Sequence, residues 1–331
     1  MKTMKLNILK MHAFASFIIL ANIGACANDN IEKNKESLSV NISNEHTALT
    51  YSSPSIPKSI NFAGDDIDLR RFDRREKLDK EILAVTYMHS TTLQMIKRAN
   101  RYFPIIEPIL KENNIPDDLK YLMVIESSVN PLARSGAGAA GLWQFMPTTA
   151  KEYGLEVNSY VDERYDVEKA THAACKYLKN SYAKYGDWAS VAASYNAGQA
   201  RISRQLEIQS VTNSLDLHLV EETSRYVYRI LAAKLLFTNP SEFGFRLRAS
   251  DLYPQLKTKN ISITTGINDL AKWANEKGTT LAFLKMLNPW LRNSMLINKT
   301  GKEYIIQIPA EDGLYYDTDS IKPYNSSWVI E

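Results

Sequence analysis

The chain has 331 residues, of which 44% are hydrophobic, and this length accommodates a well-formed core with a smaller second module. The composition excludes a fibrous or wholly disordered protein. The formal net charge is +3, but loss of a cleaved N-terminal signal with three lysines lowers the 40 basic residues to 37, equal to the 37 acidic ones. A near-neutral mature chain lacks the basic surface that nucleic-acid binding requires, so we expect no nucleic-acid partner.

Residues 1–25 have the pattern of an export signal. Three lysines precede an apolar run over residues 13–20, which is too short to span a bilayer as a finished helix. The segment leads into Ile-Gly-Ala-Cys26, which resembles the lipobox of bacterial lipoproteins, whose cysteine is acylated. We therefore expect lipidation at Cys26 and an exported protein of the cell envelope, anchored to the outer membrane and facing the periplasm. An ordinary signal cleaved after Ala27 is the alternative.

Residues 26–62 are rich in Asn, Ser, Lys and Glu and show no sustained apolar period, which is typical of a flexible tether. As a coil, such a segment has a root-mean-square span of about 30–36 Å and a maximum reach of about 120 Å. This reach suits a protein that is held at a membrane and works on a nearby polymer.

Residues 63–245 carry apolar residues at helical spacing nearly throughout, which predicts a helical domain. Pro116 and the two acids that follow it indicate a helix start, and this helix must end before Pro131, because proline cannot continue it. Glu126 lies on the apolar stripe of the helix, so its carboxyl should point toward the core. Burial disfavours the charged form, and we expect a raised pKa for Glu126, as general-acid chemistry needs.

Residues 250–312 have a different sequence pattern, which predicts a strand, two short helices and a closing strand. This order resembles a LysM-like glycan-binding module, as do the Leu-Asn pair at 287–288 and the closing Ile-Pro at 308–309. The sequence leaves open whether the module binds glycan or is a structural appendage. Residues 313–331 are expected to form a C-terminal tail.

The sequence lacks the motifs of metal sites, of serine nucleophiles and of phosphate binding. The five histidines show no metal-ligand spacing, and there is neither a Gly-x-Ser-x-Gly elbow nor a Gly-x-x-x-x-Gly-Lys phosphate loop. Cys175 lies in a helical apolar pattern, so we expect a small buried hydrophobe rather than a disulfide partner of Cys26. No metal and no cofactor are expected.

Three motifs follow one another in the helical region. They are Glu-Ser at 126–127 leading to Gln-Phe-Met-Pro at 144–147, Tyr-Asn-Ala-Gly at 195–198, and Glu-Thr-x-x-Tyr-Val at 222–227. Together they resemble the catalytic domain of the lytic transglycosylases, lysozyme-like enzymes that cleave bacterial peptidoglycan, and most closely the membrane-bound lytic murein transglycosylase D group. The resemblance covers residues 110–245. It implies a mainly α fold, with a lysozyme-like helical catalytic domain and a small α+β LysM-like module at the C-terminal side.

The resemblance also implies roles for single residues. By position, Glu126 matches the family's catalytic acid/base, and Ser127 matches the small polar partner that helps fix the end of that helix. The structural alternative for Glu126 is a satisfied carboxylate, although the negative end of a helix is an unfavourable place for one. Gly136, Gly138 and Gly141 let the backbone approach a ligand closely, or form a tight turn, or both.

The other matched residues are expected to bind the substrate. Gln144 and Met146 match positions that line the sugar groove in the family. Tyr195 matches the tyrosine whose hydroxyl faces the reacting sugar, and Asn196 matches the neighbouring amide. Glu222 matches a second acid of the groove. The structural alternatives are a tight turn for the segment of Gln144, a packed side chain at a helix end for Tyr195, and a solvated acid at a helix start for Glu222.

Glycosidases with two catalytic carboxylates place them about 5–5.5 Å apart when retaining and about 6.5–9.5 Å apart when inverting, whereas this chain offers one convincing catalytic acid. The resemblance implies substrate assistance, in which Glu126 first protonates the bond between MurNAc and GlcNAc and then deprotonates the MurNAc C6 hydroxyl, which closes a 1,6-anhydro ring. A hydrolytic muramidase and a non-catalytic glycan-binding lipoprotein are the alternatives. We expect peptidoglycan strands and a membrane as partners of a monomeric chain.

Anchoring through Cys26 is directly testable. The Cys26→Ser chain should leave the membrane fraction, because position 26 no longer has a thiol to carry the lipid. Cell fractionation followed by immunoblotting measures the distribution, with Cys175→Ser as the control that should stay membrane-bound. Membrane retention of Cys26→Ser would count against the lipobox.

Overall fold

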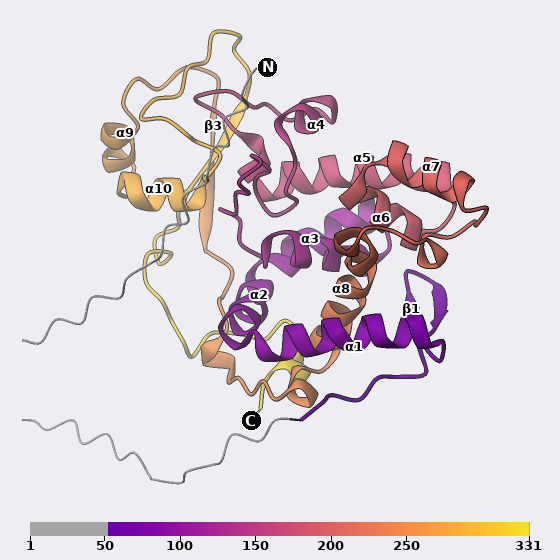
Figure 1. Ribbon diagram of the computed structural model, residues 1–331. Coiled ribbons are helices and arrows are strands. Elements are labelled where there is room, and N and C mark those ends of the chain that lie inside the picture. Colours follow the sequence, from indigo (N-terminus) through magenta and orange to yellow (C-terminus); the bar gives the residue numbers. More distant parts are fainter. Residues whose placement is uncertain (1–51, 331) are drawn as a thin grey trace, which may run out of the picture. The chain divides into compact units, whose positions relative to one another are not determined.

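The computed structural model in Figure 1 describes residues 52–330. The expected export signal, the expected lipidation at Cys26 and most of the expected tether lie outside the described residues. Across residues 52–330, no helix combines the length and the apolar character needed to cross a membrane.

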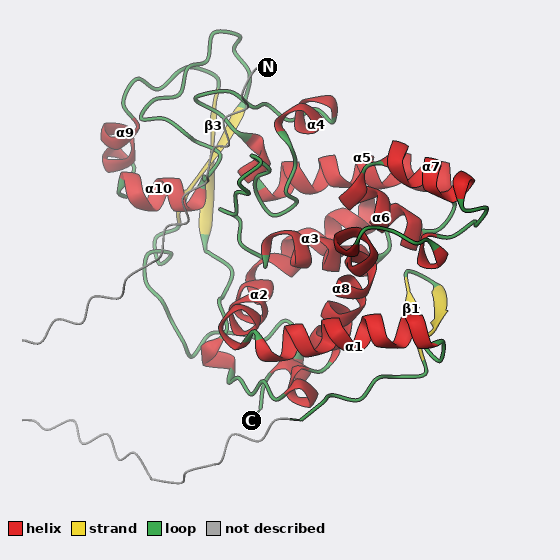
Figure 2. Cartoon of the chain, in the orientation of Figure 1, coloured by secondary structure: helices red, strands yellow, loops and turns green. Residues whose placement is uncertain are grey.

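The described chain is mainly helical, as the sequence predicts, and carries two small sheets, of which the sequence predicts only the one in the C-terminal module (Figure 2). The α-helices are α1 (Phe72–Tyr87), α2 (His89–Glu112), α3 (Lys120–Ser127), α4 (Pro147–Glu152), α5 (Val167–Tyr185), α6 (Trp188–Ala197), α7 (Gln199–Ile208), α8 (Glu221–Thr238), α9 (Leu270–Glu276) and α10 (Leu281–Leu287). The strands pair as antiparallel ladders, β1 (Ser59–Phe62) with β2 (Asp65–Asp68), and β3 (Thr258–Ile263) with β4 (Tyr304–Pro309).

The β1–β2 hairpin starts inside the range in which the sequence predicts a tether. Ala63 and Gly64 form its two-residue turn with φ of 55° and 101°, the positive values that the hairpin turn of type I′ requires. Ile60 and Phe62 are buried in the helical core, so packing against the helices begins before residue 63. A strand of four residues is too short to show a hydrophobic period in the sequence.

Most residues of helix α3 are buried. It packs against α2 and α8, and α8 also contacts α1 and α6. Even Lys120, the first residue of α3, is buried, and its ammonium pairs with Glu107 and Asp117. In the neighbouring α5, Cys175 is fully buried and free, as a small apolar residue would be. The packing leaves the C-terminal end of α3 beside α8, where the site described below is built.

The C-terminal module has the order β3, α9, α10, β4 that the sequence predicts. Its apolar residues form a second core cluster, which also takes in Val161 and Tyr165 from the helical part. Asn288 is fully buried and bridges α10 to β4. Its Nδ2 donates to the carbonyl of Gln307 at 2.6 Å, and the N–H of Gln307 donates to its Oδ1 at 2.7 Å. The asparagine therefore acts as a structural link within the module.

The C-terminal segment returns to the helical part and completes its core. Trp328 is 2% exposed, and its Nε1 donates to the carbonyl oxygen of Phe237 at 2.7 Å. Its ring lies 5.9 Å from that of Phe103 and 5.3 Å from that of Phe237, between centroids. The N–H of Ile330 donates to the carbonyl of Leu247 at 2.8 Å. Residues 321–330 thus belong to the folded core, although the sequence predicts only a tail.

Replacement of Trp328 should therefore destabilise the helical part. Trp328→Ala removes a fully buried ring, which costs about 3–5 kcal/mol of unfolding free energy. Tyr315→Ala is the control in the same segment, because Tyr315 is 85% exposed and surface changes stay within about 0.5 kcal/mol. Urea unfolding followed by circular dichroism measures both. Equal midpoints for the two variants would show that the segment is not part of the core.

Candidate active site

Glu126 lies in the last turn of α3, just before a sharp reversal of the chain. Ser128 and Val129 have φ of 52° and 55°, two successive left-handed residues that are not glycine. For a β-branched valine this conformation is a true outlier, and such strain is found most often at functional sites. The turn is closed by the N–H of Asn130, which donates to the carbonyl of Ser127 at 3.0 Å. The strained turn directly follows the residue that the sequence singles out.

The carboxyl group of Glu126 is half-buried and is held by helix α8. The hydroxyl of Tyr226, itself 1% exposed, donates to Glu126 Oε1 at 2.5 Å. Two arginines donate to backbone carbonyls at the same helix end, Arg229 to Ile125 at 3.1 Å and Arg98 to Ser128 at 3.4 Å. Their positive charges offset the negative end of the helix dipole, on which a carboxylate would otherwise be unfavourable.

The pKa of Glu126 is raised above its ordinary value, as the sequence predicts, because burial penalises the charged carboxylate. The hydrogen bond from Tyr226 and the charge of Arg229 act in the opposite direction, and the charge of Glu222 adds to the rise. Burial raises the pKa of the Tyr226 hydroxyl well above 10, and the nearby Glu126 charge raises it further. Tyr226 therefore stays protonated and remains a donor at neutral pH.

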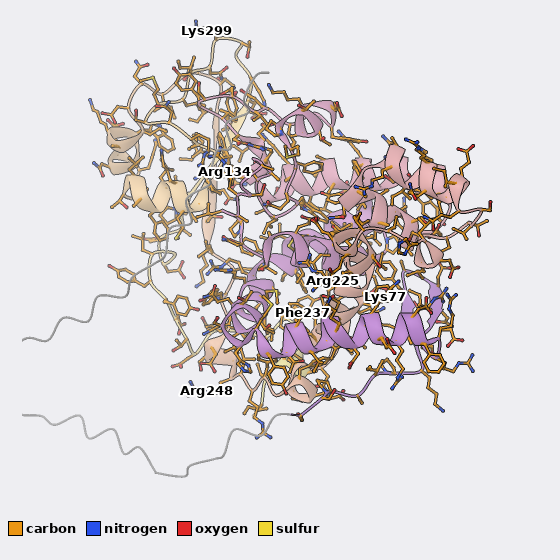
Figure 3. The ribbon with its side chains drawn as sticks, viewed as in Figure 1. Lys77, Arg134, Arg225, Phe237, Arg248 and Lys299 are labelled. Carbon is orange, nitrogen blue, oxygen red and sulfur yellow. The ribbon has the colours of Figure 1, made fainter. Side chains whose placement is uncertain are left out.

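The glycine-rich loop between α3 and α4 is a compact hairpin-like structure that carries Arg134 on its surface (Figure 3). The N–H of Gly141 donates to the carbonyl of Ala133 at 2.9 Å. Gln144 has φ of 49°, and its side-chain nitrogen donates to the carbonyls of Ala133 and Gly141 at 3.2 and 2.7 Å. The amide of Gln144 thus holds the loop together and leaves its side-chain oxygen without a partner among the described residues.

The space around the Cα atom differs among the three glycines of this loop. A Cβ at Gly141 would lie 1.8 Å from the carbonyl oxygen of Arg164, so the chain itself occupies the space that a side chain needs. A Cβ at Gly136 or Gly138 would meet nothing within 4 Å, although Gly138 has φ of +93°. At Gly141 the close approach that the sequence suggests is made to another backbone segment, and not to open space for a ligand.

Tyr195 lies near the C-terminal end of α6. Its hydroxyl donates to the carbonyl of Trp143 at 2.7 Å, and its ring contacts those of Phe145 and Tyr177. Burial and then the charge of Glu126 raise its pKa well above 10, so these two side chains are within electrostatic range. Tyr195 thereby ties α6 to the loop that carries Gln144.

The remaining expected residues differ in their exposure. Ser127 is buried, and its hydroxyl donates to the carbonyl of Met123 at 3.0 Å, within its own helix. Met146 is 43% exposed, Asn196 is half-buried at the end of α6, and Glu222 is exposed in the first turn of α8. The hydroxyl of Ser127 is therefore committed to the helix end, whereas the other three side chains reach the surface.

Sequence reasoning missed Tyr226 and Arg229 as site residues. Both follow Glu222 on α8, at the fourth and seventh positions after it, and these positions share one face of a helix. Tyr226 is part of the third motif, but the spacing served only to select Glu222. Among residues 52–330 no group of three or more His, Cys, Asp or Glu is arranged to hold a metal ion.

Comparisons with known proteins agree on one family. Residues 103–215 match the model described as Transglycosylase SLT domain, and residues 259–312 match the Soluble lytic transglycosylase C-terminal LysM-like domain. Membrane-bound lytic murein transglycosylase D of Escherichia coli K12 is 30% identical over 88% of this chain and 67% of its own length. Membrane-bound lytic murein transglycosylase C of Serratia proteamaculans is 30% identical over 32% of this chain and 34% of its own.

Among solved structures, the 70 kDa soluble lytic transglycosylase SLT70 of Escherichia coli aligns with a TM-score of 0.37 and 22% identity. The alignment covers 50% of this chain and 30% of that one.

The hydrogen bond from Tyr226 gives a prediction about Glu126. Tyr226→Phe removes a donor that stabilises the carboxylate, so the pKa of Glu126 should rise further. A carboxyl-carbon NMR titration measures it. Tyr228→Phe is the matched control on α8, because the buried Tyr228 hydroxyl has no partner among the described residues. A pKa that falls or stays unchanged in Tyr226→Phe would contradict the assignment.

Proposed function

The chain belongs to the lytic murein transglycosylase family, and we propose that it cleaves the β-1,4 bond between MurNAc and GlcNAc and leaves a 1,6-anhydro-MurNAc end. The observation that carries the proposal is the setting of Glu126, a half-buried carboxyl with a raised pKa and a hydrogen bond from Tyr226. No other carboxylate among residues 52–330 shares a hydrogen bond with this pair. A single acid of this kind suits a reaction in which the substrate supplies the nucleophile.

The first step uses Glu126 as an acid. Burial raises the pKa of Glu126 and so favours its protonated form, and the proton passes to the glycosidic oxygen as the bond to MurNAc C1 breaks. The departing GlcNAc leaves with a free C4 hydroxyl. The acetamido group of MurNAc stabilises the positive charge that develops at C1, which is the substrate assistance that the resemblance implies.

The second step uses the same group as a base. The carboxylate of Glu126 takes the proton of the MurNAc C6 hydroxyl while the C6 oxygen bonds to C1 and closes the anhydro ring. The acid is thereby restored, and no water is consumed. Tyr226 and Arg229 stabilise the carboxylate between the two steps, whereas burial favours the acid, and the balance of these effects lets one residue serve in both roles.

The surrounding residues are assigned to substrate binding. Gln144 offers its free side-chain oxygen, and Met146 offers an exposed apolar contact for a sugar. Asn196 of α6 and Glu222 of α8 supply polar groups. Tyr195 holds the loop through the carbonyl of Trp143 and interacts electrostatically with Glu126. Ser127 is assigned to the support of the helix end and not to direct contact.

The cellular setting completes the proposal. The relatives from Escherichia coli K12 and Serratia proteamaculans are named membrane-bound lytic murein transglycosylases. A lipid on Cys26 would hold this monomeric chain at the outer membrane, on the periplasmic side, where peptidoglycan strands lie within reach of a tether.

Product analysis in heavy-oxygen water tests the reaction. The purified chain, incubated with sacculi in H₂¹⁸O, should release muropeptides that end in 1,6-anhydro-MurNAc and carry no ¹⁸O at C1. Glu126→Gln should lower the rate by at least about 10²–10⁴-fold, the usual contribution of acid–base catalysis. The matched control is Glu221→Gln, because Glu221 is an exposed acid that pairs with Lys80, and it should retain activity. Mass spectrometry measures both.

The alternatives give different products. A reducing MurNAc end that contains ¹⁸O identifies a hydrolytic muramidase on the same fold. Release that is the same with Glu126→Gln as with the unchanged chain identifies a contaminating activity and leaves a glycan-binding scaffold. Either result overturns the proposed reaction.

A further inference from the structure

Three consecutive charged residues, Asp162, Glu163 and Arg164, are buried beneath the C-terminal module. Their exposed fractions are 7%, 2% and 6%. Acidic and basic residues are almost never buried to this degree unless each is paired. Nothing in the reaction above uses them, so their burial requires a separate explanation.

Glu163 receives its charge partners from both parts of the molecule. Lys169 of α5 donates to Glu163 Oε1 at 2.6 Å, and Lys302 of the C-terminal module donates to the same oxygen at 2.9 Å. The N–H of Glu156 donates to Glu163 Oε2 at 2.7 Å, and Lys302 also reaches the Glu156 carboxylate at 2.7 Å. A lysine of the module thus neutralises a carboxylate that is buried in the helical part.

Backbone pairing joins the same two parts. The N–H of Asp162 donates to the carbonyl of Trp290 at 2.9 Å, and the N–H of Arg292 donates to the carbonyl of Tyr160 at 2.8 Å. Leu291, between these two module residues, is 1% exposed. The segment 160–162 is therefore held as an antiparallel neighbour of residues 290–292, with Val161 and Leu291 buried between the two hydrogen bonds.

Arg164 connects this interface to the glycine-rich loop. Asp162 holds the guanidinium with two hydrogen bonds of 2.9 and 2.7 Å. The remaining Nη1 donates to the carbonyl of Gly138, in the middle of the loop, at 2.7 Å and to that of Phe145, near its end, at 3.0 Å. The carbonyl of Arg164 itself abuts Gly141, where only a glycine fits. The loop that carries Gln144 is thus seated on Arg164.

We propose that the C-terminal module is a brace of the active site. Lys302 and residues 290–292 fix the segment 160–164, and Arg164 acts as a positioning residue that holds the loop 133–146. The functional part of this inference rests on the proposed role of that loop in substrate binding. In this arrangement the core cluster of the module takes in Val161 and Tyr165 from the helical part, and the module supports the reaction by its packing and charge.

The test removes the charge of the module without touching the loop. Lys302→Met in the full chain leaves Glu163 with one cationic partner fewer, so segment 160–164 should open more often. Hydrogen exchange by mass spectrometry should then show about tenfold faster exchange in peptides that cover residues 133–146. With sacculi as substrate, KM should rise more than kcat falls, because the acid itself is undisturbed. Lys302→Arg should restore both readouts.

Lys257→Met provides the matched control within the same module. Lys257 pairs with Asp312 at 2.5 Å, and both side chains are more than 60% exposed. Its loss should leave the loop and the KM unchanged. Faster exchange confined to module peptides in Lys302→Met, or equal effects of the two variants on residues 133–146, would overturn the brace. The exchange readout does not depend on turnover, so failure of the proposed reaction remains distinguishable from failure of this inference.

Discussion

The site depends on a single contact between two helices, the hydrogen bond from Tyr226 to Glu126. Helix α3 is buried between α2 and α8, so its last turn can place a carboxyl only in a desolvated position. Burial and the helix dipole both disfavour a negative charge there. The hydroxyl of Tyr226 and the charge of Arg229, both on α8, lower the pKa of Glu126, but by less than burial raises it. The packing of α8 on α3 therefore sets the protonation chemistry of the site as well as the shape of the core.

Much of this could be predicted from local patterns. The helical period and the prolines at 116 and 131 define the helix of Glu126, and the apolar stripe places the carboxyl toward the core. The raised pKa follows from that placement alone. The β, α, α, β order of the module is also readable, because each of its elements has an apolar face and a clear boundary.

The features that the sequence does not predict are contacts between residues far apart in the chain. Tyr226 stands 100 positions after Glu126, and no periodicity links the two. The acidic and basic run at 162–164 has the composition of a solvated loop, and its burial depends on Lys302, more than a hundred residues later. Trp328 lies in a polar tail whose composition predicts no packing. In each case tertiary contacts decide what local composition leaves open.

The place of Trp328 has a consequence for the order in which the chain folds. Its ring packs on that of Phe103, a residue more than 200 positions earlier, and closing so long a loop delays the contact. The helices can form as they are synthesised, but their shared aromatic cluster stays open until residue 328 has been made. During synthesis the helical part therefore lacks one component of its aromatic core. It can unfold and fold as a fully cooperative unit only after the last residues of the described chain have been added.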